Sequence, residues 1–218
     1  MSAFSYWDIL RNLLQAAAWT MALSAIAFVG GGIGGLALLF LRSARVPALR
    51  LAAQATINLF QGTPLLMQLF LAFFGLAALG IEVSPWVAAG AALTLYSSAF
   101  LAEIWRGCVE AIPRGQWEAA ASLAMGYFTQ MRYVILPQAV RIAIPPTVGF
   151  SVQVVKGTAL ASIIGFVELT KAGSMITNAT FQPFTVYGTV AVLYFALCYP
   201  LSRAAQRLER KLAPAGRC

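Results

Sequence analysis

The feature that most constrains this chain is a series of long stretches without any charged side chain. Five such stretches cover residues 12–41, 51–81, 83–102, 142–155 and 172–202. Each supplies the roughly 17 to 25 residues of a membrane-spanning helix, except the fourth, which reaches that length only if it continues past Lys156. Only 10% of the residues are charged, against about 25% in a soluble domain. We therefore expect an all-α membrane protein with about five transmembrane helices.

Positive charge is distributed unevenly among the links between these stretches. It gathers at Arg42, Arg45 and Arg50 in the first link, at Arg106, Arg114, Arg132 and Arg141 in the third, and at Arg203, Arg207, Arg210, Lys211 and Arg217 near the C-terminus. The alternate links hold only Arg11 and Lys171 as basic residues. This pattern follows the positive-inside rule and predicts a periplasmic N-terminus and a cytoplasmic C-terminus. The net charge of +8 then reflects topology, and no nucleic-acid partner is expected.

Several common kinds of segment and site are disfavoured. The first stretch is too long for a signal peptide and a basic link follows it, so it is expected to stay in the membrane. The three cysteines show no paired spacing and the chain has no histidine, so neither a disulfide nor a zinc site is expected. Gly30, Gly32 and Gly35 match a dinucleotide-binding pattern, but no strand precedes them. Close helix packing through small residues is the favoured interpretation.

The second stretch contains a break at residues 61–64. Gly62 and Pro64 interrupt an otherwise apolar helical pattern, with Gln68 following one turn later. Backbone groups freed at membrane depth must be satisfied by protein or by a water-filled cavity. Two interpretations stay open. The break is either a tolerated kink in a packed helix, or part of a translocation path lined by Thr63 and the freed backbone.

Charged residues at the end of the third stretch share one helical face. Glu103, Arg106 and Glu110 are spaced i, i+3 and i+7. Such pairs usually form a solvated surface worth a few tenths of a kcal/mol each. Anchoring of the loop that follows is the alternative.

Residues 118–137 form a polar, basic link between apolar segments. Pro113 and Gly115 end the preceding helix, and a short helix is expected to restart at Gln116 or Trp117, with Glu118 in its first turn. The alanines 119–121 favour a helix with little bulk. A second helical run is expected over 127–134, ending at Leu136-Pro137. The link would then present a compact, small-residue surface on the cytoplasmic face, where an energy-supplying partner could push.

The fourth stretch carries polar residues at membrane depth. We expect Pro145-Pro146 to interrupt its helix soon after Arg141, with Ser151, Gln153, Lys156 and Thr158 beyond. An ionisable group inside the bilayer costs about 2.5 kcal/mol or more. Lys156 either extends to an interface, pairs within the protein, or meets a substrate carboxylate or gates a path.

Several motifs, taken together and in order, resemble the polar amino-acid branch of bacterial ABC importer permeases. They are Gly62-Thr63-Pro64-Leu65-Leu66 with Gln68, Ala102-Glu103-Ile104 with Arg106-Gly107, Ile112-Pro113-Arg114-Gly115-Gln116, the Glu118-Ala119-Ala120 of an EAA loop, and Ile135-Leu136-Pro137-Gln138-Ala139. The resemblance covers about residues 20–207.

The resemblance implies a type I, MetI-like transmembrane domain over residues 16–207. A periplasmic or interfacial segment, 1–15, would precede it and a cytoplasmic tail, 208–218, would follow. The EAA coupling loop would lie at about 110–137. The protein would be a multi-pass component of the bacterial inner membrane that transports an amino acid.

The same resemblance implies partners and residue roles. A second permease copy or a paralogous permease, an ATP-binding cassette subunit and a periplasmic solute-binding protein are expected, within the lipid bilayer. Glu118, Ala119 and Ala120 would contact the ATPase, with Leu123 and Met125 packing nearby. The expected substrate path is formed by Thr63, Gln68, Ser151, Lys156 and Thr158. The chain has no phosphate-binding loop, so it is not itself an enzyme and binds no cofactor; ATP and Mg would be bound by the partner ATPase.

Three departures from the family pattern bear on the site. The glycine usual in the EAA loop is Ala124 here, with Gly126 two residues later, so the turn is expected to shift. The frequent Lys-Asp-Thr-Ser-Leu reads as residues 156–160 with Gly157 and Ala159, and a frequent Asn is Gly149. Loss of an acid and a hydroxyl removes partners for a cationic substrate, which favours a neutral or acidic amino acid.

Two other classes of protein are weaker interpretations. An ion-driven secondary transporter would normally show inverted repeats and intramembrane carboxylates, and neither is found in the sequence. An intramembrane hydrolase could use Lys156 with Ser151 or Ser162, but no other feature supports such a pair.

Overall fold

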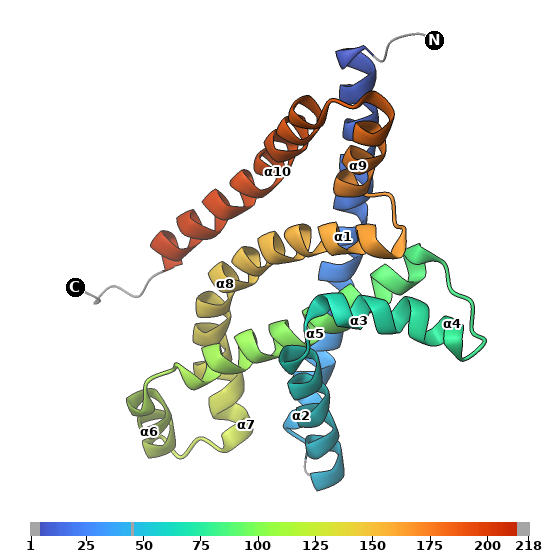
Figure 1. The fold of residues 1–218 in the computed structure, drawn as a ribbon. Helices are drawn as coiled ribbons and strands as arrows, with labels where there is room; N and C mark the ends of the chain where they lie inside the picture. The colour runs from blue at the N-terminus through green and yellow to red at the C-terminus, as the bar shows by residue number, and fades with distance from the viewer. Residues whose placement is uncertain (1–4, 45, 213–218) are drawn as a thin grey trace.

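The computed structural model describes residues 5–44 and 46–212, and within these it contains helices and no strand. The α-helices are α1 (Tyr6–Arg42), α2 (Pro47–Gly62), α3 (Leu65–Phe70), α4 (Leu76–Ala78), α5 (Pro85–Glu110), α6 (Arg114–Ser122), α7 (Tyr127–Gln130), α8 (Leu136–Gly157), α9 (Leu169–Thr180) and α10 (Pro183–Leu212) (Figure 1). The π-helical turns η1 (Leu71–Gly75) and η2 (Met131–Ile135) and the 3-10 helix η3 (Thr158–Ile164) connect them. The expected all-α fold is confirmed.

Four helical segments of the described chain are long and apolar enough to cross a membrane. They are α1, α5, the continuous run Tyr127–Ile164 and α10. A fifth span is formed if Pro47–Gly62 and Leu65–Ala78, which meet at an angle of 107°, are taken as one broken helix. This agrees with the five spans expected. The periplasmic and cytoplasmic sides of the two termini stay a prediction.

The glycines of α1 allow it to pack closely on α5. A Cβ added to Gly31 would lie 2.3 Å from the Cβ of Ser97, and one added to Gly34 would lie 2.2 Å from the Oγ of Ser98. Both distances are shorter than real Cβ contacts, so a larger residue at either position would force its neighbour to move; at Gly31 that neighbour includes the backbone of Ser97. The favoured interpretation of the glycine run, close helix packing, is therefore confirmed.

An ion-pair network joins the two helices further along. Arg42, in the last turn of α1, pairs with Glu103 of α5. Arg106 also binds Glu103, at 2.8 Å, and pairs with Glu110 on the next turn. The expected solvated face is thus in part an interhelical contact, and Glu103 is only 23% exposed. The network fixes the end of α5 from which α6 departs.

The structure differs from expectation at both proline sites. The helical run expected over 127–134 does not end at Leu136-Pro137, because the π-turn η2 leads directly into α8, which carries Pro137 near its start. The helix of the fourth span is not interrupted at Pro145-Pro146 either, since α8 is continuous through both. Neighbouring helices and local hydroxyl groups make such prolines tolerable in membrane helices. Directly after the two prolines, the hydroxyl of Thr147 donates to the carbonyl of Ala143 at 2.7 Å.

The two largest apolar clusters of the described residues join most of the helices. One joins α1, α3, α5, α8 and η3 around buried Leu23, Leu69, Leu93 and Val154. The other joins α1, α9 and α10 around Leu13, Leu169 and Val186. In Figure 1, α10 extends away from α5 and approaches the rest of the chain through α9 and α8. Helices α6 and α7 project from the far ends of α5 and α8.

Candidate functional site

The predicted break in the second span is present between α2 and α3. Thr63 has an extended backbone, with φ −112° and ψ 141°, and Pro64 follows in an extended conformation. The helix therefore loses the regular hydrogen bonds of its last carbonyls. In a membrane these groups need partners from the protein or from water.

Gln68 supplies those partners from the first turn after the break. Its side-chain Nε2 donates to the carbonyls of Phe60 at 2.9 Å and Thr63 at 3.0 Å, and to the hydroxyl of Thr63 at 3.0 Å. The Thr63 hydroxyl in turn donates to the carbonyl of Leu59 at 2.7 Å. The other amide atom of Gln68, Oε1, is buried and has no hydrogen-bond partner. Thr63 and Gln68 thus form one polar unit that stabilises the bend.

The three predicted path residues of the fourth span differ in exposure. Ser151 is half-buried and donates to the carbonyl of Val148 at 2.6 Å. Thr158 is fully buried and donates to the carbonyl of Val155 at 2.7 Å. Lys156 is exposed, and no ion pair with it is found in the described part of the chain. Of the three, only the lysine is open to a ligand.

Lys156 lines a hollow between α8 and α10. The hollow has a volume of about 400 Å³, and its other lining residues include Tyr194, Cys198, Tyr199 and Ser202. An accessible ammonium group among hydroxyl-bearing side chains could hold a carboxylate through charge-assisted hydrogen bonds.

The broken helix and the end of α8 meet through apolar atoms. A Cβ added to Gly157 would lie 3.1 Å from the Cδ2 of Leu65, one residue after Pro64, and 3.5 Å from the Cδ2 of Leu93. Glycine at position 157 therefore allows α3 to approach α8 closely. The structure places the Thr63–Gln68 unit near the segment that carries Lys156, although no hydrogen bond joins these two predicted parts within the described residues.

A buried carboxylate near this region is a feature that sequence reasoning missed. Glu168 is fully buried and accepts from the amides of Thr170 at 2.7 Å and Lys171 at 2.8 Å, and from the hydroxyl of Tyr194 at 2.7 Å. Burial raises the pKa of its carboxyl, while these hydrogen bonds oppose the shift. Glu168 caps α9, and its place directly before the helical run 169–180 was the available signal. Because Tyr194 also lines the Lys156 hollow, Glu168 braces the wall of that hollow.

The predicted coupling residues lie on and just after α6. Glu118, Ala119 and Leu123 are exposed, Leu123 by 75% of its surface, and Met125 is half-buried. Ala120 faces inward and is only 3% exposed. The side chains open to a partner are therefore those of Glu118, Ala119 and Leu123, with Ala120 packed beneath them.

Helix α6 is firmly attached to the membrane helices. Trp117 packs against a cluster of buried residues made by Ile112 from the link after α5, Ile135 of η2 and Ala139 of α8, and Val109 of α5 packs against the same cluster. Outside this cluster, the side chain of Gln138 donates to the side-chain oxygen of Gln116 at 3.1 Å. A force applied to α6 would thus reach α5 and α8 directly.

The turn after α6 lies at Ala124 and is not shifted. Ala124 has φ 57°, in the left-handed region, whereas Gly126 has φ −67°. The expectation of a shifted turn is wrong, because alanine adopts here the conformation that glycine favours. A left-handed conformation costs an alanine about 1 to 2 kcal/mol.

Comparison with known proteins agrees with this architecture. Residues 35–214 match the family described as binding-protein-dependent transport system inner membrane component. The chain is 34% identical over 201 residues to the probable amino-acid ABC transporter permease protein YckA of Bacillus subtilis (strain 168), covering 92% of this chain and 89% of YckA.

Two solved structures share the fold. One, titled as a crystal structure of an amino acid ABC transporter with histidines, superposes with a TM-score of 0.89 at 33% identity, covering 92% of this chain and 94% of that one. An inward-facing MetNI methionine ABC transporter superposes with a TM-score of 0.75 at 24% identity, covering 92% and 96%, which confirms the expected MetI-like fold. The chain therefore belongs to the inner-membrane components of binding-protein-dependent transport systems and is a multi-pass protein of the inner membrane.

Proposed function

We propose that this chain is the permease subunit of an ATP-driven importer of a polar amino acid, driven through α6 by a separate ATPase subunit. The family implies an ATP-binding subunit and a binding protein as partners. The amino-acid class is supported by the similarity to YckA and to the amino acid transporter structure. ATP and Mg would be bound by the ATPase, and this chain would hold neither.

The single observation that best supports this function is the combination of exposure and attachment at α6. The helix presents Glu118, Ala119 and Leu123 outward, while Trp117 and Gln116 connect it to α8 and its neighbours. Small side chains allow another protein to approach closely, and a carboxylate can pair with a basic residue on that partner. A short attached helix can transmit rigid-body motion, whereas a loose loop would absorb it.

Translocation would use a pair of permeases, either two copies of this chain or this chain with a paralogue. Switching between inward and outward states requires partner contacts that differ between the two states. The bend held by Gln68 and the hollow around Lys156 are the polar features available to line the path, with Thr63, Ser151 and Thr158 on the same segments.

The substrate is proposed to be a neutral or acidic amino acid. Lys156 offers a cation for a carboxylate, and the adjacent position 157 has no side chain to offer a carboxylate for a cationic group. Glu168 is occupied by three donors and is closed to substrate. The site thus has an accessible positive group without an accessible negative one nearby.

The coupling role is tested by uptake of labelled amino acids in cells that lack this chain. Wild type should restore uptake, and Glu118→Lys should abolish most of it and reduce co-purification of the ATPase. Glu209→Lys is the matched control, because Glu209 is an exposed acid on α10 far along the chain from α6. If Glu118→Lys restores uptake as well as the control does, α6 is not the coupling contact.

The substrate class is tested in the same cells with a panel of acidic, neutral, basic and cyclic amino acids. Neutral or acidic members should compete for uptake at the lowest concentrations. Arginine taken up with kinetics as good as those of any neutral amino acid would disprove the proposed class. Failure of every amino acid to respond would count against the amino-acid assignment itself.

A further inference from the structure

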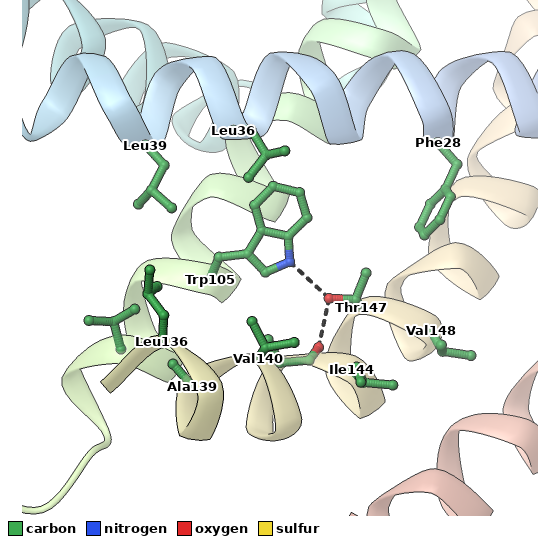
Figure 2. A pocket seen from close by; sticks show the side chains of 12 residues that line it. Phe28, Leu36, Leu39, Trp105, Leu136, Ala139, Val140, Ile144, Thr147 and Val148 are labelled. Atoms are coloured by element: carbon green, nitrogen blue, oxygen red, sulfur yellow. Dashed lines mark hydrogen bonds between the residues drawn. The ribbon is translucent and has the colours of Figure 1, made fainter. Parts of the chain in front are cut away.

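A groove outside the proposed path lies between α1, α5 and α8. Its volume is about 430 Å³. Figure 2 shows Leu36 and Leu39 of α1 on one side, Leu136, Val140 and Ile144 of α8 on the other, and Trp105 between them. None of the predicted path or coupling residues lines it.

The polar groups of this groove are already satisfied. The indole Nε1 of Trp105 donates to the hydroxyl of Thr147 at 2.9 Å, and that hydroxyl donates to the carbonyl of Ala143 at 2.7 Å (Figure 2). The other ten of the twelve lining residues are apolar. A zwitterionic amino acid would lose its hydration here without gaining a partner, which is costly. The groove therefore suits a hydrocarbon chain.

The length of the groove corresponds to one leaflet of a bilayer. On α8 it runs from Leu136 to Val148, about 18 Å at 1.5 Å per residue, and on α1 from Phe28 to Leu39, about 16 Å. Half of the hydrocarbon core of a bilayer is about 15 Å thick. Figure 2 shows Leu39 and Leu136 at one end and Phe28 and Val148 at the other, so both helices follow the groove along its length.

Uncompensated positive charge lies along the α8 side of the groove, toward the α6 loop. Arg132 precedes Leu136 by one turn, and Arg141 follows Val140, five residues after Leu136. Both are exposed, and a long arginine side chain extends along apolar surface to bring its charge to the head-group level. Arg42 and Arg106, by contrast, are paired with Glu103 and Glu110. Among the described residues, neither Arg132 nor Arg141 forms an ion pair. Basic residues in such positions attract anionic head groups.

We propose that this groove binds an acyl chain of an anionic phospholipid from the leaflet on the side of the α6 loop, with Arg132 and Arg141 facing its phosphate. The lipid would fill the space between α1 and α8 at the level from which α5 leads into α6. This site is separate from the proposed substrate path, and it shares Val109 and Ala139 with the cluster that holds Trp117 of α6.

Lipid retention by the full chain tests the site. The protein is purified in mild detergent, equilibrated with equal amounts of phosphatidylglycerol and phosphatidylcholine, and its lipid adducts are counted by native mass spectrometry. Wild type should retain phosphatidylglycerol, and Ala143→Trp, which fills the groove, should lose one such lipid. Val192→Trp is the control, because Val192 is an exposed apolar residue of α10 outside the groove. Equal retention by both variants overturns the proposal.

A second measurement does not depend on the folding of the filled variant. Phosphatidylglycerol brominated on its acyl chains should quench the fluorescence of Trp105, read as the difference between wild type and Trp105→Phe. If the brominated lipid lowers the fluorescence of wild type and of Trp105→Phe by the same amount, no acyl chain occupies the groove. If Ala143→Trp keeps its lipids but separates two permease copies on a sizing column, the groove is a protein interface and the proposal is wrong.

The arginines are tested by head-group preference. Arg132→Gln and Arg141→Gln should each reduce the preference for phosphatidylglycerol over phosphatidylcholine about five-fold. Arg203→Gln on α10, where Arg203 stacks on Tyr199, should leave it unchanged. An unchanged preference in the first two variants would remove the assigned head-group contacts and overturn the anionic specificity.

Discussion

The side-chain amide of Gln68 donates to both the hydroxyl and the carbonyl oxygen of Thr63, each at 3.0 Å. This contact closes the bend of the second span with groups of the same chain. A leucine at position 68 would fill a similar volume but leave the carbonyls of Phe60 and Thr63 without their donor. Leaving buried acceptors unsatisfied costs about 1 to 3 kcal/mol.

We expect Gln68→Leu to lower the free energy of unfolding by about 1 to 3 kcal/mol, measured by unfolding in mixed detergent micelles. Gln54→Leu is the control, because Gln54 bonds only to Asn58 on the same helix. It should change stability by less than about 0.5 kcal/mol. Equal stability of the two variants would show that the amide of Gln68 does not support the bend.

The glycine run of α1 gives a prediction whose control is the adjacent glycine of the same run. Gly31→Ala would place a methyl group 2.3 Å from the Cβ of Ser97, against the backbone of α5, and should destabilise the protein by about 1 to 3 kcal/mol. Gly32→Ala has no atom within 4 Å of its new Cβ and should be neutral or slightly stabilising. Thermal unfolding in detergent measures both. Similar melting temperatures would contradict the close packing of α1 on α5.

The sequence was sufficient for the spans and for the bend because both depend on local patterns. An uncharged stretch that crosses the bilayer core must pair its backbone N–H and C=O groups within the protein, and a helix does so within the stretch itself. Gly62 and Pro64 break the helix through their own backbone properties, since proline has no N–H to donate and its ring clashes with the preceding turn. The same local reasoning failed at Pro145, Pro146 and Pro137, where packing against neighbours and a preceding π-turn keep the helix continuous.

The candidate site was harder to predict from the sequence, because it depends on contacts between distant segments. The spacing of polar residues identified Thr63, Gln68 and Lys156, but the hydrogen bonds that occupy Gln68 and the hollow that exposes Lys156 require the packed helices. Glu168 was not identified from the sequence, because the fold buries it against Tyr194, 26 residues later. No local pattern indicates that partner.

The buried carboxylate of Glu168 should be important for stability near the hollow. Glu168→Ala removes the acceptor of two amides and one hydroxyl and should cost about 2 to 3 kcal/mol. Tyr194→Phe removes only the hydroxyl and should cost about 1 kcal/mol. Unfolding in detergent checks the order of the two. A larger loss in Tyr194→Phe would mean that the cap of α9 is not the main contribution of this cluster.

The last prediction concerns the turn that follows α6. Ala124 has φ 57°, a region in which glycine is free of the steric cost that a Cβ brings. Ala124→Gly should therefore be neutral or stabilise the protein by up to about 1 kcal/mol, because relief of strain exceeds or offsets the added freedom of the unfolded chain.

Ala121→Gly makes the same chemical change inside α6, where alanine favours the helix, and should destabilise by about 1 kcal/mol. Both residues are exposed, so the difference between the variants reports backbone conformation alone. Unfolding of each variant in detergent provides the comparison. If Ala124→Gly destabilises as much as Ala121→Gly, the turn is not left-handed at position 124, and the geometry that ends α6 after Ser122 would have to differ.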